Sequence, residues 1–182
     1  KEYLKAQALL GEGIALYEKQ RENRGVRPDP LVGKLYSDYA DIDYFISNDL
    51  ERSLENYQKA VTELNDTPSI RYRIGYIHYR NQDWESAMES FSLGYARAPS
   101  DVNLAYSFGN TLFRKGNLYL AQGHYERLME KLEAEKIRKG IVFPQTRVDH
   151  GSFVQQYMRA ANNLGVTLNR LAVRTGDSRK NA

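Results

Sequence analysis

The sequence of 182 residues has no cysteine, no apolar run of membrane-spanning length and no large excess of either charge. The missing cysteine excludes disulfides, cysteine-based zinc sites and thiol nucleophiles, and it leaves the redox compartment open. No apolar run approaches the roughly 20 residues that cross a bilayer, and no signal-like segment opens the chain. We therefore expect a soluble protein. The sequence leaves its localisation unknown and is compatible with the cytoplasm or the periplasm.

Basic and acidic residues number 26 and 23 and are spread along the chain, so no strongly basic face is predicted. The three histidines, His78, His124 and His150, share no metal-ligand spacing with one another or with acidic residues. No Gly-rich loop follows a predicted strand, and we interpret Gly11 and Gly13 as small residues at a helix contact. The sequence thus predicts no enzyme, no metal site and no cofactor.

A period of 34 residues is present, since Gly75 and Gly109 are separated by that interval. The same interval joins further pairs: Trp84 and Leu118, Ala87 and Ala121, Phe91 and Tyr125. Helix-start signals keep the same phase, with Asp49, Asp83 and Asn117 each just before an apolar-periodic run. Pro68 and Asp101 stand where the other helix of a repeat should begin. Each repeat is therefore predicted to be a pair of helices.

These repeats resemble tetratricopeptide repeats, whose pattern has small residues where the two helices of a hairpin touch. The middle repeat matches that pattern in order at Gly75, Ala87, Gly94 and Pro99. The first repeat departs from it at Asp41 and Ser53, and the third departs at Leu128 and Glu133. The resemblance implies an all-α fold, a right-handed superhelical stack of antiparallel helix hairpins, or α-solenoid.

Both ends of the chain look like parts of further repeats, and it begins at Lys1 without a methionine, so we expect a piece of a longer array. No helix breaker lies between Glu130 and Gly140, so the last helix of the third repeat should be extended. The expected divisions are a partial repeat with connector at 1–30, repeats at 31–67, 68–101 and 102–139, a loop at 140–151, and the first helix of a truncated repeat at 152–182.

The resemblance also implies that first helices line a concave groove. Counted from the small residues, the expected partner-binding residues are Tyr39, Phe45, Tyr72, Arg73, Tyr76, Tyr79, Arg80, Tyr106, Asn110, Phe113 and Arg114. Aromatic and arginine side chains suit a partner segment with apolar and acidic residues. The alternative is that the tyrosines pack against neighbouring hairpins and the arginines complement helix dipoles. Asp38 and Ile42 stand where chaperone-clamping members have Lys and Asn, so that clamp is incomplete.

The leading hypothesis is a non-enzymatic interaction scaffold that binds a peptide or helical segment of a partner protein. The alternative is a structural unit that self-associates through its terminal helices or builds a larger complex. Single-stranded RNA binding ranks last, because Arg and Tyr are mixed on the expected groove but a basic stripe is missing.

Overall fold

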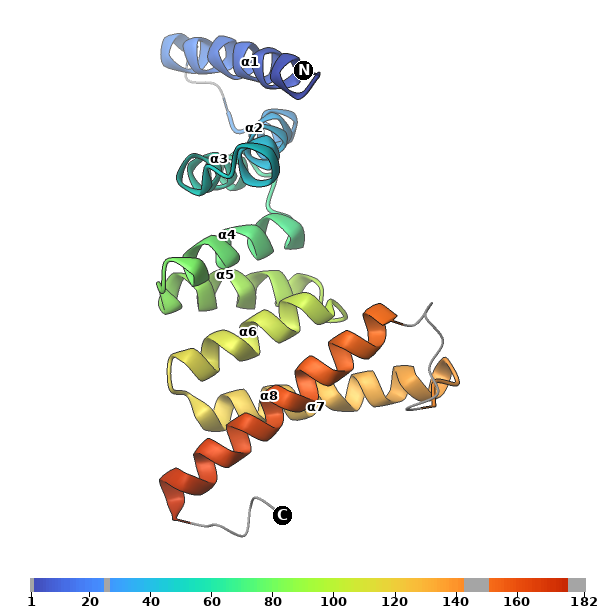
Figure 1. Cartoon of the computed structure of the whole chain (residues 1–182). Helices are drawn as coiled ribbons and strands as arrows, with labels where there is room; N and C mark the ends of the chain where they lie inside the picture. The colour runs from blue at the N-terminus through green and yellow to red at the C-terminus, as the bar shows by residue number, and fades with distance from the viewer. Residues whose placement is uncertain (1, 25–26, 143–150, 177–182) are drawn as a thin grey trace. The chain divides into compact units, whose positions relative to one another are not determined.

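The computed structural model describes residues 2–24, 27–142 and 151–176 (Figure 1). Within these ranges the chain is helical and has no strand, which confirms the predicted all-α class. Contacts divide the chain into two compact units, unit 1 (Lys1–Asp83) and unit 2 (Trp84–Ala182). The division falls inside residues 68–101, which the sequence predicts to be one repeat. None of the described helices is long and apolar enough to span a membrane.

Unit 1 contains α1 (Glu2–Arg24), α2 (Pro30–Ile42), the π-helical turn η1 (Asp43–Ser47), α3 (Leu50–Thr62) and α4 (Pro68–Arg80). Short polar side chains start α2, α3 and α4 by accepting from amides of the first turn. The Asp49 carboxylate accepts from Arg52 N–H at 3.1 Å, and the Thr67 hydroxyl accepts from Ile70 N–H at 3.3 Å. Pro68 follows at a position that needs no amide hydrogen. The predicted helix starts at Asp49 and Pro68 are confirmed.

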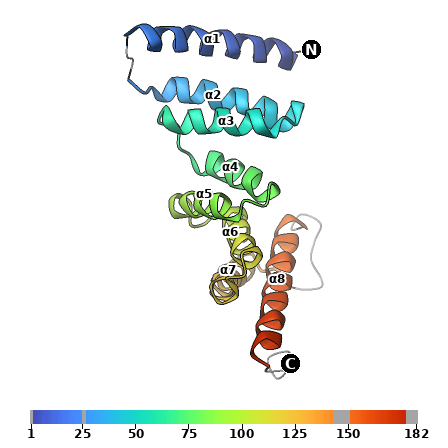
Figure 2. The ribbon, with the colours of Figure 1, turned by 90° about the vertical axis from the view of Figure 1, so that its left-hand side faces the viewer.

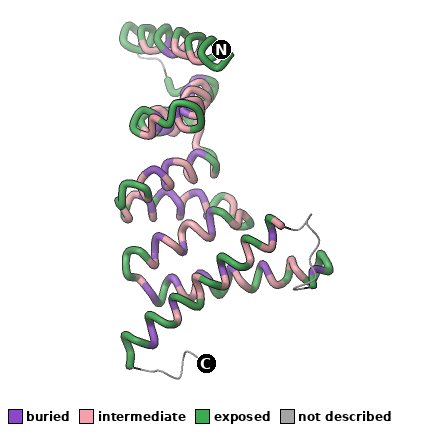
Figure 3. Tube along the Cα trace, viewed as in Figure 1, coloured by how far each residue is buried: buried purple, intermediate pink, exposed green. Residues whose placement is uncertain are grey.

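The helices of unit 1 pack in chain order, with α2 between α1 and α3 and with α4 on α3 (Figures 1 and 2). Their shared core is built from the buried residues Ile14, Tyr17, Val32, Tyr36, Ala40, Tyr57, Ala60, Ile70, Ile74 and Ile77. At Gly33 helices α2 and α3 approach so closely that an added Cβ would lie 2.7 Å from the Glu63 carbonyl oxygen. Figure 3 shows buried and exposed stretches alternating along these helices, with α1 mostly exposed.

The turn η1 was not anticipated from the sequence, and it adds a residue to the first helix of this hairpin. Asp43 is fully buried there, and its carboxylate accepts from Arg52 Nε at 2.8 Å and from Gln7 Nε2 at 3.1 Å. The turn ends at Asn48, whose φ of 52° is left-handed. Because the partners of Asp43 come from α1 and α3, the turn is stabilised by tertiary contacts that periodicity does not reveal.

Unit 2 contains α5 (Trp84–Arg97), α6 (Val102–Arg114), α7 (Leu118–Arg138) and α8 (Gly151–Thr175). The Asp101 carboxylate accepts from the Asn103 and Leu104 amides at 2.8 and 3.0 Å, which confirms the predicted start of α6. Asn117 occupies the N-cap position of α7 but makes no side-chain capping hydrogen bond. In Figure 1 helix α6 lies between α5 and α7, and α8 crosses α7 obliquely while also contacting α6.

Helix α7 has 21 residues against 13 in α6, so its last turns continue beyond the hairpin. Its C-terminal half shares a buried apolar cluster with α8 that includes Leu128, Leu132, Phe153 and Ala160. The loop expected at 140–151 falls largely on residues 143–150, which lie outside the described part of the chain.

Candidate functional site

In unit 1, Asp41 at the end of α2 connects three helices. Its carboxylate accepts from the Tyr57 hydroxyl of α3 at 2.5 Å and pairs with the Arg73 guanidinium of α4 at 2.9 Å. Burial, followed by the hydrogen bond to Asp41, raises the pKa of the Tyr57 phenol. The Arg73 guanidinium also lies 5.0 Å from the centre of the Phe45 ring. Arg73, expected in the groove, is therefore already engaged within the chain.

Beside this network, aromatic side chains from η1 and α4 gather on one surface. The Tyr72 and Tyr76 rings are stacked with centroids 6.4 Å apart, and Tyr44 lies 6.2 Å from Tyr76 in an edge-to-face arrangement. Phe45 contacts Tyr44 at 4.8 Å and is 61% exposed. Arg80 is exposed on the last turn of α4. We call Tyr44, Phe45, Tyr72, Tyr76 and Arg80 the aromatic surface.

Tyr44 is a further aromatic residue of this surface, and a count of the first repeat from Asp41 does not include it. The buried Ala40 is the better origin, because it packs against α3, where Ser53 Oγ donates to its carbonyl at 3.0 Å. Counting from Ala40 brings Tyr44 into the set, keeps Phe45 and omits Tyr39, which is half-buried with the Arg52 guanidinium 5.8 Å from its ring centre. The extra residue of η1 causes this shift of one position. Burial raises the pKa of Tyr44 to about 12.

In unit 2, Asn110 of α6 connects three helices in the same way. Its side-chain oxygen accepts from the Tyr125 hydroxyl of α7 and from Asn163 Nδ2 of α8, each at 2.5 Å. Asn163 Nδ2 also lies 3.1 Å from the Tyr106 hydroxyl, and the Arg170 guanidinium lies 4.4 Å from the centre of the Phe113 ring. Three expected groove residues of α6 are thus in contact with α8.

The two networks share one arrangement: a tyrosine of a second helix donates to a first-helix residue, which also accepts from a later helix. Tyr57 and Tyr125 are 68 residues apart, which is two periods, whereas Asp41 and Asn110 are 69 apart because of η1. At the intermediate position Phe91 has no hydroxyl. The spacing of the two tyrosines was a signal in the sequence, but their acceptors were hidden by the one-residue shift.

The remaining expected groove residues occupy more varied surroundings. Tyr79 is half-buried on α4, and Arg114 is exposed at the end of α6. The structure therefore brings Phe45, Tyr72 and Tyr76 together in unit 1, and Tyr106, Asn110 and Phe113 together in unit 2. That the eleven expected groove residues bind a partner stays a prediction.

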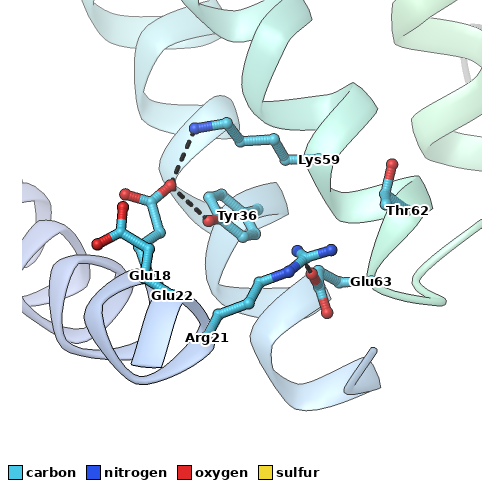
Figure 4. Close-up of a pocket in the computed structure, with 7 residues that line it drawn as sticks. All are labelled: Glu18, Arg21, Glu22, Tyr36, Lys59, Thr62 and Glu63. Atoms are coloured by element: carbon cyan, nitrogen blue, oxygen red, sulfur yellow. Dashed lines mark hydrogen bonds and ion pairs between the residues drawn. The ribbon is translucent and has the colours of Figure 1, made fainter. Parts of the chain in front are cut away.

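A polar cavity of about 500 Å³ lies among α1, α2 and α3 (Figure 4). Glu63 is buried at its edge, forms an ion pair with Arg21 and accepts from the Tyr17 hydroxyl at 2.8 Å. Glu18 accepts from Lys59 Nζ at 3.0 Å and from the Tyr36 hydroxyl at 2.9 Å. Lys59 and then Tyr36 lower the pKa of Glu18. These pairs attach α1 to the next hairpin and explain the cavity as a structural contact.

The histidines have structural surroundings where the chain is described. His124 is buried, with Nε2 at 2.8 Å from the Ala105 carbonyl oxygen, and burial lowers its pKa. His78 Nδ1 lies 3.2 Å from the Asp83 carboxylate. His150 lies outside the described residues. Over residues 2–24, 27–142 and 151–176, no group of three His, Asp or Glu side chains is placed to hold a metal ion.

No family model matches this sequence. The chain is 24% identical over 106 residues to TPR repeat-containing protein MJ1428 of Methanocaldococcus jannaschii, covering 57% of this chain and 19% of that protein. It thus spans about a fifth of the length of this curated relative.

Two solved structures are similar in fold. The first TPR of Spaghetti (RPAP3) bound to HSP90 peptide SRMEEVD has a TM-score of 0.59 at 17% identity, covering 81% of this chain and 98% of that one. YrrB, described as a TPR protein with an unusual peptide-binding site, has a TM-score of 0.51 at 18% identity, covering 91% and 86%. The chain has the α-solenoid fold of tetratricopeptide-repeat proteins, which confirms the resemblance read from the sequence.

Proposed function

We propose that this chain is an interaction scaffold, without catalytic activity, whose aromatic surface binds a peptide or helical segment of a partner protein. The observation that carries the proposal is the exposed Phe45 ring beside the Tyr44, Tyr72 and Tyr76 rings. Aromatic rings supply large contact areas with few torsions, and they are common among the residues that dominate interface energies. The peptide-binding descriptions of the two similar structures support the same class of function.

The charges near this surface narrow the partner's chemistry. Arg73 is paired with Asp41, so Arg80 is the exposed cation of the aromatic surface. Asp38 is on the same helix as Asp41 and pairs with Lys34 at 2.9 Å. We expect a mainly apolar segment with an acidic group near Arg80, because Arg73 and Lys34 are already paired with Asp41 and Asp38.

Substitution of the exposed aromatic residues tests this function. Peptides selected from a random display library on the immobilised chain serve as probes. Phe45→Ala and Tyr72→Ala should each weaken binding by roughly 30-fold, equivalent to about 2 kcal/mol for an interface hot spot. Tyr119→Ala on α7 is the matched control, since Tyr119 is 63% exposed against 61% for Phe45. Circular dichroism verifies that each variant is folded.

The proposal that the aromatic surface binds peptides would be abandoned if the selected peptides bound the Phe45 and Tyr72 variants as tightly as the unmodified chain. Equal weakening by the Tyr119 control would also contradict it.

A second candidate, self-association through terminal helices, is favoured by the outer side of α1. Leu9 and Leu16 are exposed there, two turns apart on one face of the helix, and Leu4 is exposed nearby. An assembly role would use this face, which the peptide proposal does not involve.

A further inference from the structure

In unit 2, α8 crosses the C-terminal half of α7 (Figure 1). A shallow, open cleft of about 600 Å³ lies there, lined mainly by α7. Its apolar lining includes Met129 and Ile137 from α7 and Leu164 from α8. Ile137 is 72% exposed, although apolar side chains of this size are usually withdrawn from water. The cleft exists because α7 continues past the end of its hairpin and α8 lies obliquely across it.

The packing of α7 against α8 fixes the shape of the cleft. On the neighbouring face of α7, Leu132 is buried with Phe153 and Ala160 of α8, so the crossing is anchored in the core. Tyr157 of α8 donates to Glu133 Oε2 of α7 at 2.8 Å at the side of the cleft. These contacts hold α7 and α8 together while Ile137 stays exposed and Met129 is only partly buried.

The rim of the cleft is acidic. Glu126, Glu130 and Glu133 line it, and no lysine or arginine is among its lining residues. Glu133 pairs with Lys136, which together with Tyr157 lowers its pKa. At 1.5 Å per residue these three carboxylates extend over about 10 Å, the length of two helical turns.

We propose that this cleft docks an amphipathic helix of a partner protein that carries Lys or Arg residues beside an apolar stripe. An apolar floor bordered by carboxylates at helical spacing matches a helix with apolar residues on one face and cations along its edge. Apolar contact supplies the affinity, and the acidic rim selects the charge and the register of the partner helix. The same rim disfavours nucleic acid at this site.

Two synthetic peptides test the proposal on the full chain. Both have about 18 residues, a length at which helices begin to form in water, and a leucine stripe at helical spacing. One carries lysines beside the stripe and the other carries glutamates at the same positions. Fluorescence anisotropy should show that the lysine peptide binds the unmodified chain and that the glutamate peptide binds at least 10-fold more weakly.

Charge reversal of the rim gives the decisive comparison. Glu126→Lys with Glu130→Lys should weaken the lysine peptide at least 10-fold and strengthen the glutamate peptide, whereas Ile137→Ser should weaken both. Glu51→Lys with Glu55→Lys on α3 is the matched control, since both residues are exposed and also one turn apart.

Equal binding of the two peptides, or binding unchanged by the rim variant, would overturn the proposal. A rim variant that abolished self-association of the chain without affecting peptide binding would also overturn it, because a second copy would then be the occupant. These outcomes are separate from those of the Phe45 and Tyr72 variants, which lie in unit 1.

Discussion

Asp41 and Asn110 show how one polar side chain can hold three helices together. Each accepts a tyrosine hydroxyl from the next helix of its hairpin and a second donor from a later helix. The Tyr57 and Tyr125 side chains are fully buried, so their hydroxyls have little access to water as an alternative partner. Ala40 fills the small position of the first repeat, and Asp41, one residue later, has a hydrogen-bonding role like that of Asn110 after Gly109.

This role predicts an order of destabilisation at the residue scale. Tyr57→Phe removes one hydrogen bond and should lower the free energy of unfolding by about 1 kcal/mol. Asp41→Ala should cost more, about 2 kcal/mol, because the Tyr57 hydroxyl and the Arg73 guanidinium both lose a partner. The loss of unfolding free energy is not larger, because the Asp41 side chain is 37% exposed and water partly screens its ion pair.

Urea denaturation followed by circular dichroism measures both changes, with Tyr119→Phe on the exposed face of α7 as the control. A cost for Asp41→Ala no greater than that for Tyr57→Phe would show that Arg73 gains nothing from the pair.

At the scale of whole helices, two glycines distinguish tight contacts from open ones. At Gly33 an added Cβ would lie 2.7 Å from the Glu63 carbonyl oxygen and 2.9 Å from the Ala60 carbonyl oxygen, both backbone atoms that cannot rotate away. At Gly165, in the middle of α8, an added Cβ would meet nothing within 4 Å. The open surroundings of Gly165 show that this glycine serves no close helix approach.

Alanine at these positions should therefore act in opposite directions. Gly33→Ala should destabilise the chain by about 3 kcal/mol, since α2 and α3 must separate to admit the methyl group. Gly165→Ala should stabilise it by about 0.5–1 kcal/mol, because alanine favours a helix over glycine. Thermal unfolding monitored by circular dichroism tests both, and a stabilising Gly33→Ala or a destabilising Gly165→Ala would refute the packing described for that helix.

Helices were predictable where local signals decide them. Asp49, Pro68 and Asp101 start helices through capping and a fixed φ, effects that depend on a few neighbouring residues. The turn η1 was not predictable, because its cause is the burial of Asp43 against residues of α1 and α3. The missed Tyr44 follows from that turn, since one added residue changes which side chains share a face.

Across the whole molecule, the 34-residue period predicts a stack of hairpins but not where contacts are densest. The chain divides between Asp83 and Trp84, and each unit has its own buried apolar cluster. The oblique crossing of α8 over α7 was likewise invisible to periodicity, which describes a helix's own faces and not its angle to a neighbour. The α7–α8 cleft could therefore not be predicted from the sequence, although the extension of α7 could.

Self-association, a property of the whole molecule, is suggested by the exposed leucines of α1. Its outer face exposes Leu9 and Leu16, 69% and 66% respectively, at a spacing that places both on one side of the helix. If copies of the chain associate through this face, the mass measured by sedimentation equilibrium should rise with concentration. Leu9→Ser with Leu16→Ser should then restore the monomer, since each substitution removes apolar area from the contact.

The matched control for that experiment is Leu120→Ser with Tyr119→Ser on α7, where both side chains are also exposed. It should leave the concentration dependence unchanged, because those residues belong to another helix. A strictly monomeric chain at every concentration would remove α1 as an interface between copies, and it would leave peptide binding at the aromatic surface as the stronger of the two functions.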